Sequence, residues 1–98
     1  MADIIEIKRE DQGHKGRFAL YENGQYAGEM TYSSAGKNLL IIDHTAVEEG
    51  HNGKGFGKKL LMKVVEYARE NNRKIIPLCP YAKSVFDKTP EIKDVLHA

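Results

Sequence analysis

The sequence lacks the features of an exported or membrane-bound protein. Its single cysteine, Cys79, excludes an internal disulfide and is compatible with a reducing compartment. No apolar run approaches the roughly 20 residues that a bilayer requires. The first ten residues, MADIIEIKRE, carry charges where a signal peptide needs its apolar segment. We therefore expect a cytoplasmic protein without a membrane span.

A large excess of one charge is also missing. The chain has 15 Lys and Arg against 14 Asp and Glu, a net charge of +1. Nucleic-acid binding depends on neutralising many phosphates, so this balance gives little support for such a partner. Hydrophobic residues make up 41% and charged residues 30%, which is ordinary for a globular protein. A length of 98 residues predicts one domain, residues 1–98.

The N-terminal half of the sequence is rich in strand patterns. Asn23-Gly24 is the dipeptide that type I′ turns prefer, so it predicts a hairpin between residues 17–22 and 25–33. Apolar alternation predicts an earlier strand at 3–9, followed by a turn at 11–16. A turn at 33–37 and a buried strand at 38–47 complete this half.

The C-terminal half changes to helical periodicity. From Gly55 onward apolar residues recur at spacings of three and four, and Asn71-Asn72 would end the helix. A short strand is expected at 74–78 and a second helix at 80–88, with Pro80 in its first turn. Strand, helix and strand then form a βαβ unit with parallel strands. The predicted fold is α+β, a mixed, mostly antiparallel five-stranded sheet with about two helices.

Alternating glycines precede the first helix. Gly53, Gly55 and Gly57 have no Cβ to obstruct an anion, and a helix N-terminus offers unpaired N–H groups and a positive dipole end. A P-loop would need glycine at Asn52 and Ser or Thr at Lys59, and a dinucleotide fingerprint would need another glycine further on. Both patterns fail. The alternative interpretation is a glycine-rich turn without a ligand.

A third phosphate-binding pattern fits. Residues 52–57, Asn-Gly-Lys-Gly-Phe-Gly, resemble the Arg/Gln-x-x-Gly-x-Gly/Ala segment of the GNAT superfamily of N-acetyltransferases. HTAVEEGHNGKGFGKKLL, IIPLCPYAKSVF and KTPEIKDVL are similar to small stand-alone GNAT-like domains, so the resemblance covers residues 38–96. It implies that acetyl-CoA is the cofactor and that loop amides hold its pyrophosphate. The implied cofactor contacts are Thr45, Ala46, Val47, Asn52, Gly53, Lys54, Gly55, Phe56, Gly57, Lys58 and Lys59.

The sequence departs from the family pattern at three places. Asn52 replaces the usual Arg or Gln, which shortens the side chain that braces the loop. Only DQGHKG stands where standard members carry two helices, so the acceptor side should be open. Phe86 is followed by Asp87, where many members have the tyrosine that protonates the leaving thiolate. The lysines after the loop either meet coenzyme A phosphates or form a solvated helix face.

Three side chains are candidates for catalysis. Cys79 precedes Pro80 at the expected N-cap of the last helix, where the dipole favours the thiolate, so it could accept the acyl group. The alternative is a small buried hydrophobic residue. His44 could act as a base or orient Cys79, or it could be a hydrogen-bonded core residue. Tyr81 is the nearest replacement for the missing tyrosine, or a rim aromatic packed on the sheet.

Three functions are compatible with these residues. The leading hypothesis is an acyltransferase that moves an acetyl group from coenzyme A to an unknown amine or small-molecule acceptor, with the acetyl group near Leu78 and Cys79. The second is a non-catalytic acyl-CoA-binding or sensor module. The third is a structural or nucleic-acid-interacting domain that shares only the shape. The remaining histidines lack metal-ligand spacing, so no metal is expected, and we expect a monomer.

Overall fold

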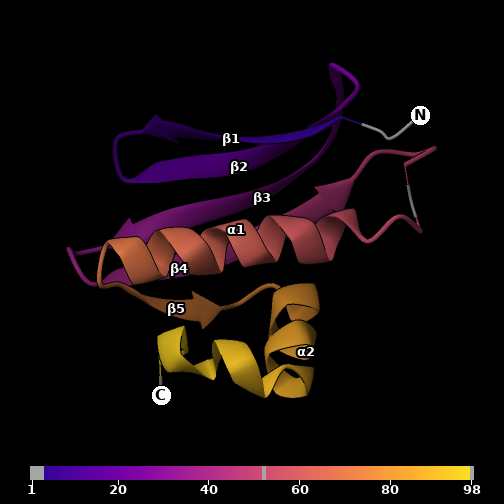
Figure 1. The fold of residues 1–98 in the computed structure, drawn as a ribbon. Coiled ribbons are helices and arrows are strands. Elements are labelled where there is room, and N and C mark those ends of the chain that lie inside the picture. Colours follow the sequence, from indigo (N-terminus) through magenta and orange to yellow (C-terminus); the bar gives the residue numbers. More distant parts are fainter. Residues whose placement is uncertain (1–3, 52, 98) are drawn as a thin grey trace.

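The computed structural model describes residues 4–51 and 53–97. Five strands, two α-helices and one 3₁₀ helix follow one another along the chain (Figure 1). Within these ranges no helix is long and apolar enough to cross a membrane. The elements in order are β1 (Ile5–Gln12), β2 (Lys15–Glu22), β3 (Gln25–Ala35), β4 (Leu39–Val47), α1 (Phe56–Glu70), β5 (Lys74–Pro77), α2 (Pro80–Lys88) and η1 (Pro90–Val95).

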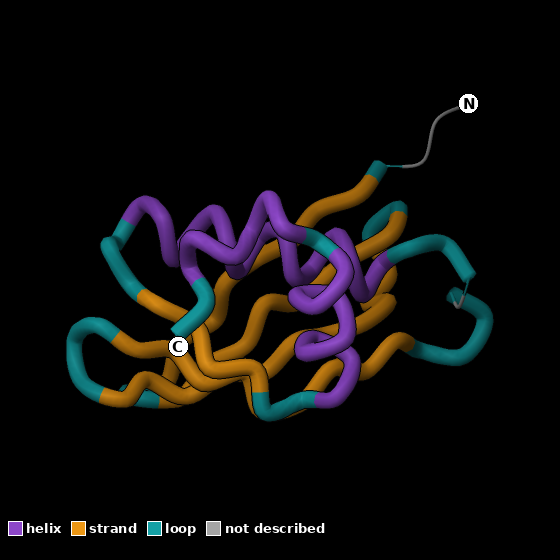
Figure 2. The backbone as a smooth tube through the Cα atoms, turned by 90° about the horizontal axis from the view of Figure 1, so that it is seen from below, coloured by secondary structure: helices purple, strands orange, loops and turns teal. Residues whose placement is uncertain are grey.

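The sheet has the strand order β1-β2-β3-β4-β5. The first four strands pair antiparallel and β5 pairs parallel with β4, which confirms the predicted α+β fold and its βαβ unit. Helix α1 lies across one face of the sheet, whereas α2 and η1 follow beside β5 (Figures 1 and 2). No helix of the described residues covers the opposite face, which we call the open face (Figure 2).

Two turns differ from their predicted lengths because the flanking strands pair further than expected. Strand β1 continues to Gln12, which pairs with Lys15, so the turn predicted at 11–16 shrinks to Gly13 and His14. Gly13 has the positive φ of 66° that such a tight turn requires. Strand β3 likewise runs through Ala35 and includes the first three residues of the turn predicted at 33–37.

The other boundaries follow the sequence closely. Asn23 and Gly24 have φ of 52° and 84°, as a type I′ turn requires, so the predicted hairpin is confirmed. The predicted helix 80–88 coincides with α2. At the end of α1, Asn72 adopts the left-handed φ of 54°, which ends the helix where expected.

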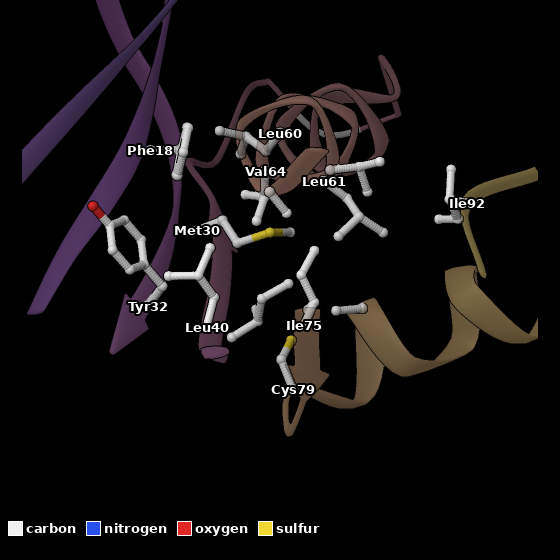
Figure 3. Packing of buried hydrophobic residues seen from close by; sticks show 14 of the residues in the cluster. Phe18, Met30, Tyr32, Leu40, Leu60, Leu61, Val64, Ile75, Cys79 and Ile92 are labelled. Carbon is white, nitrogen blue, oxygen red and sulfur yellow. The ribbon is translucent and has the colours of Figure 1, made fainter. Parts of the chain in front are cut away.

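The core lies between α1 and the sheet. The apolar stripe of α1 points at Met30, Leu40 and Ile75 of the strands (Figure 3). Cys79 sits at the margin of this cluster, below Ile75, and Ile92 joins it from η1. Burial of this stripe fixes α1 over the middle of the sheet and places its N-terminus beside the end of β4. The buried residues of α1 are Phe56, Gly57, Leu60, Leu61, Val64, Val65 and Ala68.

Candidate functional site

Strands β4 and β5 separate halfway along β4. Their pairing ends at Ile42 and Pro77, while β4 continues to Val47. The N–H groups of Leu78 and Cys79 both donate to the Ile42 carbonyl, each at 3.1 Å, and the chain then turns into α2. In the described residues, therefore, no strand covers the β5 side of β4 after Ile42.

A β-bulge occurs at the point of separation. Thr31 of β3 lies opposite His44 and the next residue, Tyr32, lies opposite Ile42, so Asp43 is an extra residue in β4. The bulge reverses the alternation of side chains that follow it. Thr45 and Val47 therefore share the α1 face, and His44 lies on the open face.

The segment between β4 and α1, residues 48–55, is here called the glycine loop. Gly50, Gly53 and Gly55 have φ of 90°, 81° and 76°. Apart from their chain neighbours, no described residue has an atom within 4 Å of a Cβ built on any of them. These glycines are required by their backbone conformation, since other residues rarely adopt it. Gly55 is the N-cap of α1, and the Lys59 N–H donates to its carbonyl at 3.1 Å. The N–H groups of the first turn have no helical acceptor and point into the loop.

Gly57 has a different role from Gly50, Gly53 and Gly55. A Cβ on Gly57 would lie 2.8–2.9 Å from Cζ, Cε2 and the hydroxyl oxygen of Tyr81, so the Tyr81 ring rests directly on the first turn of α1. Burial, and secondly the neighbouring Cys79, raise the pKa of Tyr81, which keeps its phenol protonated at neutral pH. The sequence placed both residues in the site but did not predict their contact.

The loop, β4 and Tyr81 surround a hollow of about 360 Å³, here called the loop hollow. Six of the predicted cofactor contacts line it, from the end of β4, the loop and the first turn of α1. Ala46 does not, because the alternation after the bulge places it on the open face with His44. Asn52 lies outside the described residues. The lining residues are Thr45, Val47, His51, Gly53, Gly55, Phe56, Gly57 and Tyr81.

Cys79 lies beside the loop hollow and is 5% exposed. It is the N-cap of α2, as predicted, and its thiol donates to the Thr45 hydroxyl with Sγ and Oγ1 3.2 Å apart. His44 is exposed and faces the other side of the sheet, so the structure does not bring it to Cys79. The suggestion that His44 orients Cys79 is therefore not supported by the geometry.

A buried ionic cluster anchors the loop from β2. Glu22 is 5% exposed, and its Oε1 lies 2.6 Å from Nδ1 of His51. The Lys54 ammonium donates to both Glu22 oxygens at 3.0 Å. These contacts, the Lys54 hydrogen bond foremost, hold the pKa of Glu22 below its usual range. Lys54 is thus already paired with a carboxylate.

The other predicted lysine contacts lie on the far side of the loop. Lys58 and Lys59 are exposed and line a groove of about 540 Å³ between β1 and α1. This groove, whose apolar walls include Ile7 and Met62, also receives Lys54 and Gly55. It is larger than the loop hollow, but Thr45, Cys79 and Tyr81 are not part of it.

Sequence reasoning missed three residues of this site, namely Glu22, Asp43 and His51, the last of which was considered only as a metal ligand. Glu22 gave no signal, because a glutamate before an Asn-Gly turn is usually solvated and its partners are 29 and 32 positions away. Asp43 gave none either, because a bulge depends on the register with β3. In the described residues no group of three or more His, Cys, Asp or Glu side chains could hold a metal ion.

Comparison with known proteins connects this geometry to a family. The sequence model of the GCN5-related N-acetyl-transferase family matches residues 17–95. A solution structure of a "GCN5-like putative N-acetyltransferase" from Staphylococcus aureus is 40% identical, with 95% of this chain and 88% of that chain covered and a TM-score of 0.70. No curated protein matches the chain.

More distant structures share the fold. A Bacillus subtilis acetyltransferase in complex with CoA is 18% identical, covers 89% of this chain and 74% of that chain, and has a TM-score of 0.66. The ribosomal-protein-alanine N-acetyltransferase of Brucella melitensis biovar Abortus 2308 is also 18% identical, with 89% and 64% covered and a TM-score of 0.69. From the family match and the 40% identical relative, we conclude that this chain belongs to the GCN5-related N-acetyltransferase family.

Proposed function

We propose that the protein binds acetyl-CoA and transfers the acetyl group to an amine. The observation that carries this proposal is the uncovered part of β4, which runs from the bulge at Asp43 to the loop hollow. Such an edge offers backbone N–H and C=O groups to a ligand that carries amides of its own. The CoA complex of the B. subtilis protein, which has the same fold, supports this choice of ligand.

Each part of the cofactor finds a matching surface. The pyrophosphate would rest on the glycine loop and the first N–H groups of α1. The pantetheine amides would pair with residues 44–47 as an added strand does. The acetyl end would then reach Thr45 and Cys79. Lys58 and Lys59, which are exposed in the first turns of α1, would meet the remaining phosphate.

The reaction needs three tasks from the protein. The amine attacks the thioester carbonyl, a C–N bond forms and the C–S bond breaks, while a β4 backbone N–H stabilises the oxyanion. Tyr81, protonated in the loop hollow, would give its proton to the leaving coenzyme A thiolate. His44, exposed on the open face, would take the proton that the amine loses. The acceptor thus arrives from the face opposite the cofactor.

Cys79 is proposed as a wall of the acetyl site. Its sulfur is buried and hydrogen-bonded to the Thr45 hydroxyl, so it is poorly exposed for attack on a thioester. This favours a structural role over that of an acyl carrier. Intact mass spectrometry after incubation with acetyl-CoA tests it. An added acetyl group that hydroxylamine removes, and that Cys79→Ala lacks, would show that the cysteine itself is acylated.

One observation favours a non-catalytic acyl-CoA-binding module as the second candidate. The two-residue turn between β1 and β2 leaves the open face of the described residues without helices that could shape an acceptor site. Acetyl-CoA consumption with panels of amines separates the candidates. Binding without turnover for any acceptor would favour the module.

Amide-resolved NMR titration with acetyl-CoA and with free coenzyme A tests the cofactor site. We expect shifts at residues 44–59, joined by Cys79 only when the acetyl group is present. Absence of shifts at millimolar ligand would refute cofactor binding. The protein is expected to act as a monomer without nucleic-acid or membrane partners.

A further inference from the structure

Glu22 is the one buried charged side chain of the described residues. It stands at the end of β2, outside the segment that forms the glycine loop, and contacts the loop twice, through His51 and Lys54. Its side chain is 6% exposed, against 45% for Lys54, so the cluster is closed on the β2 side and open toward solvent at the lysine.

Burying a carboxylate costs desolvation energy that even a good ion pair does not always offset, so stability alone does not explain why Glu22 is buried. The glycine loop suggests another benefit. Glycine has more backbone freedom than any other residue, and the loop contains Gly50, Gly53 and Gly55. Losing this freedom when a ligand binds would reduce the affinity. A loop that is already fixed by side-chain contacts loses less.

We propose that Glu22 is a positioning residue, which holds the glycine loop in its phosphate-binding shape through His51 and Lys54. The inference rests on the proposed function, because it concerns the same cofactor site. It assigns Lys54 to the protein's own carboxylate and not to a coenzyme A phosphate. Glu22 itself touches neither the cofactor nor the acceptor.

The packing around the cluster supports this assignment. The His51 ring lies 6.3 Å from the Phe56 ring between centroids, and Lys54 Nζ lies 6.0 Å from the same ring. Phe56 is the first residue of α1 and is 4% exposed. The cluster therefore connects β2 to the start of α1, and it fixes the position of the backbone N–H groups in that first helical turn.

A direct role for Lys54 makes the opposite prediction. If Lys54 bound phosphate, Glu22 would compete with the ligand for the ammonium, and removal of the carboxylate would strengthen coenzyme A binding. If Glu22 positions the loop, its removal weakens binding. The sign of the change therefore separates the two roles.

The test compares Glu22→Gln with the wild type by amide-resolved titration against two ligands, coenzyme A and S-acetylpantetheine. The second ligand has the pantetheine and acetyl parts but no pyrophosphate. We expect Glu22→Gln to weaken coenzyme A binding roughly ten- to a hundredfold and to leave S-acetylpantetheine binding unchanged. Glu22→Asp, which keeps the charge but is one methylene shorter, should show a smaller loss in the same direction.

The double variant Glu22→Gln/Lys54→Met should bind coenzyme A no more weakly than Glu22→Gln, because Lys54 acts through the pair. Asp94→Asn removes a carboxylate that pairs with Arg69 away from the loop, and its affinity should equal that of the wild type. Unchanged or stronger coenzyme A binding in Glu22→Gln overturns the inference, as does an equal loss for both ligands. Should Glu22→Gln fail to fold, Glu22→Asp carries the same comparison. Failure of the wild type to bind coenzyme A would instead overturn the proposed function.

Discussion

The two ends of α1 are built in contrasting ways. At the N-terminus the N-cap is a left-handed glycine, and the charged cluster that anchors the loop there is centred on the buried Glu22. At the C-terminus the N–H groups of Asn71 and Arg73 return to carbonyls of the helix, at 3.1 Å and 2.8 Å. The charged pair at that end, Arg69 with Asp94, is 46% and 55% exposed.

The two ends differ in how their backbone groups are satisfied. The C-terminal end satisfies its own backbone groups and adds a surface ion pair, which contributes little in water. At the N-terminal end the N-cap Gly55 has no side chain that could accept from the first N–H groups, and the contacts of Glu22 hold the loop in place. Such a helix N-terminus suits an anionic ligand.

The largest effect is expected from the middle of the helix, on which both ends depend. Leu61 is fully buried, so Leu61→Ala should lower the free energy of unfolding by about 2–5 kcal/mol. Chemical denaturation measures the change. Glu70→Ala, on the exposed side of the same helix, is the control and should change stability by less than about 0.5 kcal/mol. Equal effects would contradict the packing described here.

Gly57→Ala should separate activity from stability at the N-terminal end. The new Cβ displaces the Tyr81 ring, which is 40% exposed and has room to swing outward. Alanine also favours the helix by up to about 1 kcal/mol, so the melting temperature should stay level or rise. The acetyl-transfer rate should fall about a hundredfold, the usual size of a lost proton donor.

Tyr81→Phe is the matched variant for that experiment. It keeps the ring on Gly57 but removes the hydroxyl, so the rate should fall by the same factor without a change in packing. Full activity in Tyr81→Phe would exclude the phenol as the proton donor.

Low pH should weaken the contacts that Glu22 makes with the glycine loop. Because the pKa of Glu22 is lowered in the folded protein, its contribution to stability is complete above the usual value of 4.5 and is lost as the pH falls through the folded value. The stability difference between wild type and Glu22→Gln should therefore shrink below about pH 4.5. Denaturation at a series of pH values measures it. A difference that stays constant into strong acid would contradict the ion pair.

The smallest effect is expected at the C-terminal end. Asp94→Asn breaks the exposed pair with Arg69 and should lower the free energy of unfolding only slightly, because solvent screens both charges. Added salt should reduce even that difference, because exposed charges are screened. A larger loss of stability that does not depend on salt would contradict the exposed Arg69–Asp94 pair seen in the structure.

The sequence was sufficient for features that depend on neighbouring residues. The stripe of α1, the Asn23-Gly24 turn and the proline start of α2 are local, and all three were predicted with nearly correct bounds. The family resemblance rested on contiguous motifs and is confirmed by the match over residues 17–95.

Features set by contacts between distant elements were not predictable. The bulge at Asp43 arises from pairing with β3, and it places His44 on the face opposite Cys79. The sequence predicts room for an anion at Gly57 but not the Tyr81 ring that lies beside it. It predicts a phosphate contact for Lys54 but not the pairing of its ammonium with Glu22, 32 positions earlier. Charge and spacing along the chain carry no information about such partners.

The strand order has a consequence for folding. Strands β1 to β4 are sequential neighbours joined by tight turns, so each pairing closes a small loop at low entropic cost. Pairing of β4 with β5 must wait for the whole of α1 to be included. We expect the antiparallel meander to form first and the loop hollow last. The loop hollow would then be among the first parts to open, and a ligand bound there would stabilise its closed form.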